Sequence, residues 1–243
     1  MNEEFRAKQA ARQHAWDILE REGLSRPPFP VHGRIPNFVG AELAAQRLFA
    51  EPVWAEAKAI KVNPDTAQQA VRLEALRRGI CLYVPTPRLT GGFMRLDPNL
   101  IAPACFPQAA ARQTMSRWAQ PVALRDMPQL DAMVSGCAAV TPQGKRCGKG
   151  AGYSDIEFAM LLELGLEARP VATTVHDVQV VGDFPVDSND LPLSVICTPT
   201  RTIRVASPHS APTGIQWQRL SQRDLEAMPV LRELQLLRQA SLE

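Results

Sequence analysis

Apolar runs alternate with helical segments along the middle of the chain, and this alternation predicts the fold. The runs 57–62 and 80–84 have the length and composition of buried strands, and the stretch between them has a helical pattern that Gly79 ends. Short joints between strand, helix and strand are typical of a parallel sheet. Because this order dominates to about residue 175, we expect one three-layer α/β/α domain with a largely parallel sheet.

The remaining segments extend the same scheme. Proline-rich residues 24–37 and the proline- and glycine-rich residues 85–107 are expected to form loops. We expect further helices over 2–22 (with Asn2 as its cap), 39–50, 108–119 and 155–164, and further strands over 132–140, 171–175, 178–181, 193–197 and 202–205.

The end of the chain carries its own helix signals. Ser221 with Asp224 resembles a capping box, and Pro229 indicates a second helix start or a kink. An apolar stripe then follows one helix face, formed by Leu231, Leu234 and Leu237. We therefore expect a single domain over 1–243, with a C-terminal helix at about 221–240 packed on it rather than on a partner.

Composition and charge narrow the classes of function. The 243 residues are 45% hydrophobic and 21% charged, which suits an ordinary globular core. The formal net charge of +2, from 27 basic and 25 acidic residues, argues against a general nucleic-acid binder, because such proteins neutralise many phosphates. A net charge this small remains compatible with one local basic site.

Cysteines and hydropathy bear on the compartment. The five cysteines are scattered and form no C-x-x-C pair, which argues against a zinc site and fits a reducing cytoplasm. The first residues are charged and lack the apolar segment of a signal peptide, and no run of about 18 apolar residues would span a membrane. We expect a cytoplasmic protein.

The stretch 140–155 has the layout of an anion-binding loop. An apolar run leads into it and a helical run leaves it, and its four glycines and three cations are Gly144, Gly148, Gly150, Gly152, Lys145, Arg146 and Lys149. Glycine lets the backbone approach a ligand, and a helix N-terminus offers unpaired N–H groups to an anion. The pattern predicts a phosphate site; the alternative is a glycine-rich turn with solvated lysines.

Two familiar phosphate motifs do not fit this stretch. Only three residues separate Gly144 from Gly148, and a glycine follows Lys149 where a Walker A loop has Ser or Thr. In the dinucleotide fingerprint the third glycine would come one residue later.

The stretch does resemble a segment of the 5-formyltetrahydrofolate cyclo-ligases (methenyltetrahydrofolate synthetases), close to Gly-x-Arg-Leu-Gly-x-Gly-Gly-Gly-Tyr-Tyr-Asp-Arg. The residues in register are Gly144, Arg146, Gly148, Gly150, Gly152, Tyr153 and Asp155. Further matches are Lys8 and Arg12, four apart, Asp65-Thr66, and the series Gln179, Pro185, Asp190 and Thr198. The resemblance covers about residues 5–205 and looks closest to the methenyltetrahydrofolate synthase domain-containing branch.

The resemblance implies a fold and a reaction. The fold is the three-layer NagB/RpiA/CoA transferase-like type. The reaction converts 5-formyltetrahydrofolate to 5,10-methenyltetrahydrofolate with ATP and Mg²⁺, and the partner is a reduced folate or a related small molecule, bound by a monomer or homodimer.

The resemblance also assigns residues. ATP would be bound by Lys8, Arg12, Gly144, Lys145, Arg146, Gly148, Lys149, Gly150, Gly152 and Tyr153. Catalysis would rest on Arg146, Lys149 and Tyr153, and the substrate on Asn63, Asp65 and Tyr153. Asp155 would bind magnesium; its alternative role is a plain helix cap, and that of Tyr153 is packing.

Three departures from the family pattern leave the substrate open. Asn63 stands where the family has a glutamate, Ser154 replaces a tyrosine, and Ile156 replaces an arginine. Two alternatives follow: a ligase or kinase on the same scaffold that acts on another compound, for example a thiamine-related one, or a non-catalytic nucleotide-binding module.

His176-Asp177 is a second candidate site. Both residues follow an apolar strand, and a histidine beside an aspartate can act as a general base. The alternative is a hydrogen-bonded turn between two strands.

Overall fold

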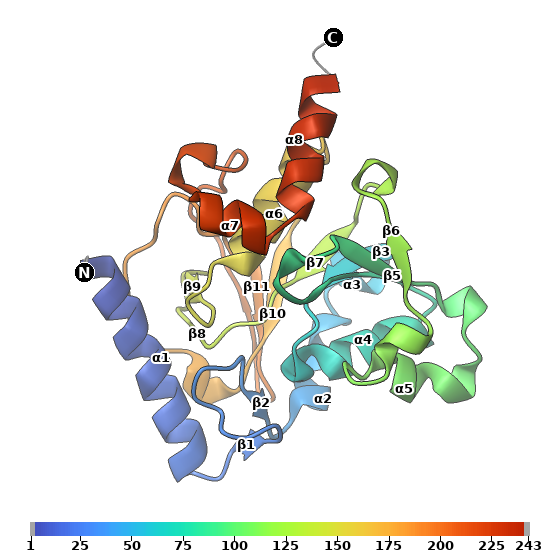
Figure 1. Ribbon diagram of the computed structural model, residues 1–243. Coiled ribbons are helices and arrows are strands. Elements are labelled where there is room, and N and C mark those ends of the chain that lie inside the picture. Colours follow the sequence, from blue (N-terminus) through green and yellow to red (C-terminus); the bar gives the residue numbers. More distant parts are fainter. Residues whose placement is uncertain (1–2, 241–243) are drawn as a thin grey trace.

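The computed structural model describes residues 3–240 (Figure 1). Its helices are α1 (Glu3–Arg21), α2 (Ala41–Leu48), α3 (Pro52–Ala55), α4 (Gln69–Arg77), α5 (Phe106–Ala110), α6 (Tyr153–Glu163), α7 (Gln222–Ala227) and α8 (Val230–Ala240). Its strands are β1 (Ser25–Arg26), β2 (Asn37–Phe38), β3 (Ala59–Val62), β4 (Cys81–Pro85), β5 (Phe93–Leu96), β6 (Gln120–Val122), β7 (Ala132–Val134), β8 (Ala139–Val140), β9 (Arg146–Cys147), β10 (Val171–Thr174), β11 (Val195–Cys197) and β12 (Thr202–Arg204). Asn2, expected to cap α1, lies outside the described residues.

A mixed sheet forms the centre, in the order β12-β11-β10-β7-β3-β4-β5-β6. The five inner strands, β11 to β4, run parallel, and β12, β5 and β6 are antiparallel additions at the two edges. The predicted α/β class with a largely parallel sheet is therefore confirmed.

Helices cover both faces of this sheet, because the inner strands are apolar on both sides. Ile60 and Val62 of β3 point to the face that α2, α4 and α5 cover, where they pack with Leu76. Met133 of β7 points to the opposite face, where it packs with α6 and α8. The predicted three layers are visible in Figure 1.

The C-terminal signals are also confirmed. Ser221 caps α7 in a reciprocal capping box with Asp224, and Pro229 lies directly before α8. Leu231 and Leu234 are fully buried on the face that meets α6. That residues 1–243 form a single domain stays a prediction.

Two predicted strands are wrong. The run 132–140 forms the sheet strand β7 only to Val134; its end, β8, leaves the sheet and pairs antiparallel with β9. The run 178–181 is occupied by a 3₁₀ turn over Asp177–Gln179, with a single bridge from Val180 to Val140. The apolar residues there pack against a hairpin rather than extend the sheet.

The predicted helix 108–119 is wrong as well, and the predicted loop 85–107 contains the strand β5. Helix α5 ends at Ala110, and Ala111 is extended. The carbonyl of Ala110 accepts a hydrogen bond from Nε of the buried Arg72 (2.9 Å). A tertiary contact therefore takes the acceptor that a longer helix would use.

Among residues 3–240, every helix is too short or too polar to cross a bilayer.

Candidate functional site

The glycine stretch forms a hairpin, a loop and a helix start. Gly144 turns the chain between β8 and β9 at φ 81°, and a Cβ there would lie 2.5 Å from the carbonyl oxygen of Leu193, so only glycine fits. Residues 148–152 then lead to α6, which Gly152 begins in the left-handed region at φ 69°. The loop thus presents the N-terminus of α6.

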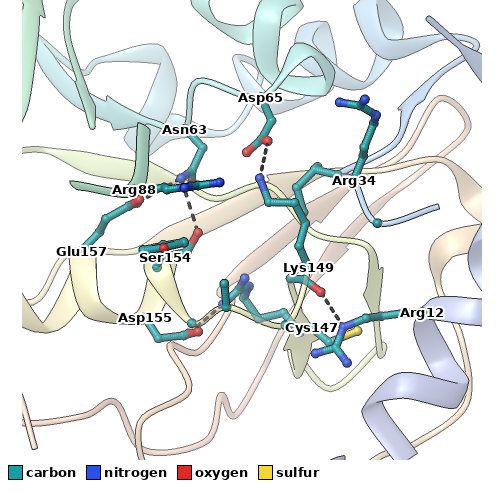
Figure 2. Close-up of a pocket in the computed structure, with 18 of the residues that line it drawn as sticks. Arg12, Arg34, Asn63, Asp65, Arg88, Cys147, Lys149, Ser154, Asp155 and Glu157 are labelled. Carbon is teal, nitrogen blue, oxygen red and sulfur yellow. Dashed lines mark hydrogen bonds and ion pairs between the residues drawn. The ribbon is translucent and has the colours of Figure 1, made fainter. Parts of the chain in front are cut away.

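Helix α1 supplies two cations beside this loop, and one of them contacts it. Lys8 and Arg12 lie one turn apart and are both buried. Nε of Arg12 donates to the carbonyl oxygen of Gly148 (2.6 Å) (Figure 2). Nζ of Lys8 pairs with Asp190 (2.5 Å). Segments 136 residues apart in the chain therefore meet at one place.

A pocket of about 800 Å³ opens between these elements and the carboxyl end of β3. Eight basic and six acidic residues among the described ones line it. Every one of those six carboxylates has an ion-pair partner. The excess positive charge belongs to arginines without a carboxylate partner in residues 3–240, for example Arg88 and Arg112, and it favours an anionic ligand.

Arg146 and Asp155 form the most buried ion pair beside the glycine loop. Nη1 of Arg146 lies 2.6 Å from Oδ1 of Asp155, and the backbone N–H of Leu191 donates to the same oxygen (3.0 Å). Burial disfavours the charge of Arg146, but Asp155 and Cys137 together outweigh this effect and raise the pKa of the guanidinium. The buried Nε of Arg146 has no hydrogen-bond partner among residues 3–240.

Lys149 spans the pocket from the loop to the end of β3. Its Nζ lies 3.1 Å from Oδ1 of Asp65 (Figure 2). The backbone under Asp65 is held by the fully buried Arg72, which donates to the carbonyl oxygens of Asn63 (2.5 Å) and Asp65 (3.1 Å). Burial lowers the pKa of Arg72 to about 9. We call Lys8, Arg12, Arg146, Lys149 and loop 148–152 the phosphate side of the pocket.

The opposite wall contains a buried polar cluster. Oε2 of Glu157, on α6, is in contact with Nζ of Lys61 and accepts from Nδ2 of Asn63 (3.0 Å). Nδ2 of Asn63 also reaches Oγ of Ser154 (3.4 Å) (Figure 2). Burial raises the pKa of Glu157, against the opposing effect of Lys61. We call Lys61, Asn63 and Glu157 the buried triad.

Sequence reasoning missed Lys61 and Glu157. A signal was present, because Lys61 interrupts an apolar strand and a buried lysine needs an acidic partner. Its partner comes from a helix 96 positions later, which no local pattern indicates.

Most of the predicted site residues lie together. The pocket is lined by Lys8, Arg12, Asn63, Asp65, Arg146, Gly148, Lys149, Gly150, Gly152, Tyr153 and Asp155. Gly144 and Lys145 do not line it; Lys145 instead pairs with Asp183 (2.7 Å), which is also outside the pocket lining. Ile156 is outside the pocket too, where it packs against the core.

His176 and Asp177 do not line this pocket and fit the turn interpretation. Nδ1 of His176 accepts from the N–H of Val178, which caps a short 3₁₀ turn. Oδ1 of Asp177 accepts from the hydroxyls of Thr198 (2.7 Å) and Thr200 (2.6 Å). Burial lowers the pKa of His176. Both side chains are engaged in holding loops.

This combination of fold and site defines a class. A glycine loop at the start of a helix, with buried cations from a distant helix, has the features expected of an anion site on an α/β scaffold. The chain belongs to the 5-formyltetrahydrofolate cyclo-ligase family, whose sequence model matches residues 4–199. The resemblance in the glycine stretch is thereby confirmed.

Similar proteins support the predicted branch. Methenyltetrahydrofolate synthase domain-containing proteins of Mus musculus and Homo sapiens are 41% and 39% identical over 235 residues. These matches cover 94% of this chain but only 63% and 61% of the relatives, so the chain spans less than two thirds of their length. The Aquifex aeolicus 5,10-methenyltetrahydrofolate synthetase has the same fold, with a TM-score of 0.50, 16% identity, and coverage of 88% of this chain and 99% of its own.

Proposed function

We propose that this chain binds ATP with Mg²⁺ and uses them to close 5-formyltetrahydrofolate to 5,10-methenyltetrahydrofolate. One observation carries the proposal: Arg12 of α1 donates to the glycine loop at 2.6 Å, in a pocket with excess positive charge. Family membership supports the folate as the substrate class.

The residues of the phosphate side fit a nucleotide. The buried Nε of Arg146 is a hydrogen-bond donor with no partner among residues 3–240. A Cβ on Gly148 would lie 2.7 Å from Nη2 of Arg146, so this position of the loop favours glycine. Lys149 is 42% exposed on its side chain and can exchange Asp65 for a phosphate oxygen. Lys8 and Arg12 complete the cationic wall.

Asp155 fits a magnesium ligand. Its Oδ1 is taken by Arg146 and Leu191, while no hydrogen bond within residues 3–240 uses Oδ2. No cluster of three acidic, histidine or cysteine side chains exists in that range. One carboxylate suits Mg²⁺, which is usually held by few protein oxygens together with phosphate oxygens and water.

The side chains of the pocket would then position the reacting groups and stabilise the charge that develops on the phosphate. ATP supplies the phosphoryl group that makes the formyl oxygen a leaving group. Arg146 and Lys149 stabilise negative charge on the phosphate oxygens, and the walls exclude water from the reacting groups. Tyr153 lines the pocket from the first turn of α6, and Asn63 and Asp65 line it from the segment after β3, where they would border the substrate.

The direct test is turnover by the full chain. Purified protein with millimolar ATP and Mg²⁺ should convert 5-formyltetrahydrofolate to a product with methenyl absorbance, and release one phosphate per product. Lys149→Ala should lower the rate at least about 100-fold, while Lys58→Ala, an exposed lysine outside the pocket, should not. Absence of product from folded wild-type protein would refute the proposal.

A second candidate is a ligase or kinase for another compound on the same scaffold. Asn63 and Ser154, two of the three departures from the family pattern, lie in the pocket and contact each other. ATP hydrolysis stimulated by another pterin or by a thiamine-like compound, but not by 5-formyltetrahydrofolate, would favour this candidate. Thermal stabilisation by ATP alone, without hydrolysis, would favour a binding module instead.

A further inference from the structure

Glu157 is a buried carboxylate at the wall of the pocket, with one oxygen engaged and one unused. Glu157 is 4% exposed and lies one turn after Tyr153 on α6. Oε2 takes both contacts, from Lys61 and from Asn63. No hydrogen bond among residues 3–240 uses Oε1, although Glu157 lines the pocket.

The neighbours fix this carboxylate in place. Oδ1 of Asn63 accepts from Nζ of Lys61 (3.2 Å) and from the N–H of Gly136 (3.3 Å). The amide is therefore oriented with its NH₂ group toward Glu157. Lys61, 2% exposed, supplies the opposite charge. The result is a rigid acceptor in a group of residues with no net charge.

Such an acceptor selects one kind of ligand group. A carboxylate oxygen only accepts hydrogen bonds, so it binds an N–H or O–H donor and disfavours another acceptor. Because Lys61 already balances the charge, the ligand group need not be a cation. The phosphate side prefers anions, so the two walls of one pocket select different parts of a ligand.

We propose that Glu157 is a specificity-determining residue that accepts a hydrogen bond from the N–H donor edge of the reduced folate's ring system. This inference rests on the proposed substrate class. It assigns Lys61 and Asn63 as positioning residues, which hold the carboxylate and do not touch the ligand ring.

The position of the carboxylate can be exchanged. Nδ2 of Asn63, at the end of β3, lies 3.0 Å from Oε2 of Glu157, and Nζ of Lys61 contacts both side chains. A carboxylate at position 63 would therefore lie next to the place that Glu157 occupies, with the same counterion. The inference predicts that the pocket needs one carboxylate there, from either element.

Three variants of the full chain test this prediction. Glu157→Gln alone leaves Lys61 buried without a counterion and can fail to fold, so Lys61→Met is combined with it. The exchange variant combines Asn63→Glu with Glu157→Gln. The matched control is Glu163→Gln, on the same helix and outside the pocket, where Glu163 pairs with Arg238 (2.9 Å). Calorimetry measures the Kd of 5-formyltetrahydrofolate and, separately, of ATP with Mg²⁺.

We expect Lys61→Met/Glu157→Gln to weaken folate binding about 10- to 100-fold, as for loss of a hydrogen bond to a charged group. ATP binding should stay within about twofold. The exchange variant should recover folate binding to within about tenfold of wild type, and Glu163→Gln should match wild type.

Several results would overturn the inference. If Lys61→Met/Glu157→Gln binds the folate as tightly as wild type, Glu157 has a purely structural role. If the exchange variant binds the folate as weakly as Lys61→Met/Glu157→Gln, a carboxylate at this place is not what the ligand requires. If wild type binds the folate without forming product, the proposed reaction fails, but the same Kd comparison still decides the role of Glu157. If wild type does not bind the folate, both proposals fail.

Discussion

The phosphate side and the buried triad solve the same problem, keeping charges inside a pocket, in different ways. On the phosphate side, the Lys149 side chain is 42% exposed and pairs with Asp65, and an arriving anion can replace that partner. In the triad, Lys61 and Glu157 are almost completely buried and neutralise each other. The first wall is arranged to exchange its contacts on binding, and the second to keep them.

Arg146 is the residue where this contrast is most easily broken. It belongs to the phosphate side but is 3% exposed, like the triad. Arg146→Met should lower the free energy of unfolding by about 3–5 kcal/mol, because it leaves Asp155 without its counterion. Urea denaturation without ligand measures the loss, and adding Asp155→Asn should recover part of it. An unchanged denaturation midpoint would mean that the pair contributes nothing to folding.

Arg12 tests whether the two walls act independently. Arg12→Ala should weaken the binding of ATP with Mg²⁺ about 10- to 100-fold, because a charge-assisted contact near the loop is lost. Binding of 5-formyltetrahydrofolate should not change. Arg21→Ala, an exposed arginine at the other end of α1, serves as the control in the same calorimetric titration. Equal losses for both ligands would show that the walls are coupled.

Gly144 and Gly152 allow the stability that each glycine contributes to the loop to be compared. Gly144→Ala should cost at least about 2 kcal/mol of stability, because its Cβ would meet the carbonyl of Leu193 at a positive φ. Gly152→Ala should cost about 1 kcal/mol, since its φ is positive but nothing lies within 4 Å. Thermal unfolding ranks the two; the reverse order would contradict the geometry.

Asp187 gives the smallest effect, at the rim of the pocket. Its hydrogen bonds to Arg219 (2.7 and 2.8 Å) lower the pKa of Asp187 to about 2, below its ordinary value of 3.8. A depressed pKa stabilises the fold above pH of about 4, and this contribution is lost as the pH falls toward 2. Because Arg219 is half-exposed, Asp187→Asn should cost less than about 1 kcal/mol at pH 7.

The measurement for Asp187 is the difference in Tm between wild type and Asp187→Asn across pH. It should be constant from pH 5 to 8 and shrink toward pH 3. A difference that grows on acidification would show that another group carries the dependence.

The parts of this fold that depend on neighbouring residues could be predicted from the sequence. Strand β3, helix α4 and strand β4 follow from apolar runs and the stop at Gly79. The glycine loop and the helix after it follow from glycines and cations within twelve positions. Local pattern is sufficient there because the same few residues make both the element and its contacts.

The remainder depends on contacts between distant segments. The run 108–119 has three alanines directly after its first residue, and these have helical propensity, yet Arg72 takes the carbonyl of Ala110 that would continue the helix. The buried triad likewise joins β3 to α6, and neither segment alone marks its lysine or glutamate as a pair. Strand β5, which lies between β4 and the edge strand β6, is short and follows two glycines, so its pattern is weak.

Arg72 has a consequence for how this protein opens. One buried guanidinium bonds the carbonyls of Asn63 and Asp65, at the pocket, and of Ala110, at the end of α5. If either the segment 63–65 or the end of α5 moves away, the buried Arg72 guanidinium loses part of its hydrogen bonds. Both segments should therefore unfold locally in a single cooperative event. In hydrogen exchange, the amides of Gln68 and Ala111 should then share one opening free energy, although they lie 43 positions apart in the chain. The pocket wall at Asn63 and Asp65 would thus be kept rigid by α5, a helix that does not line the pocket.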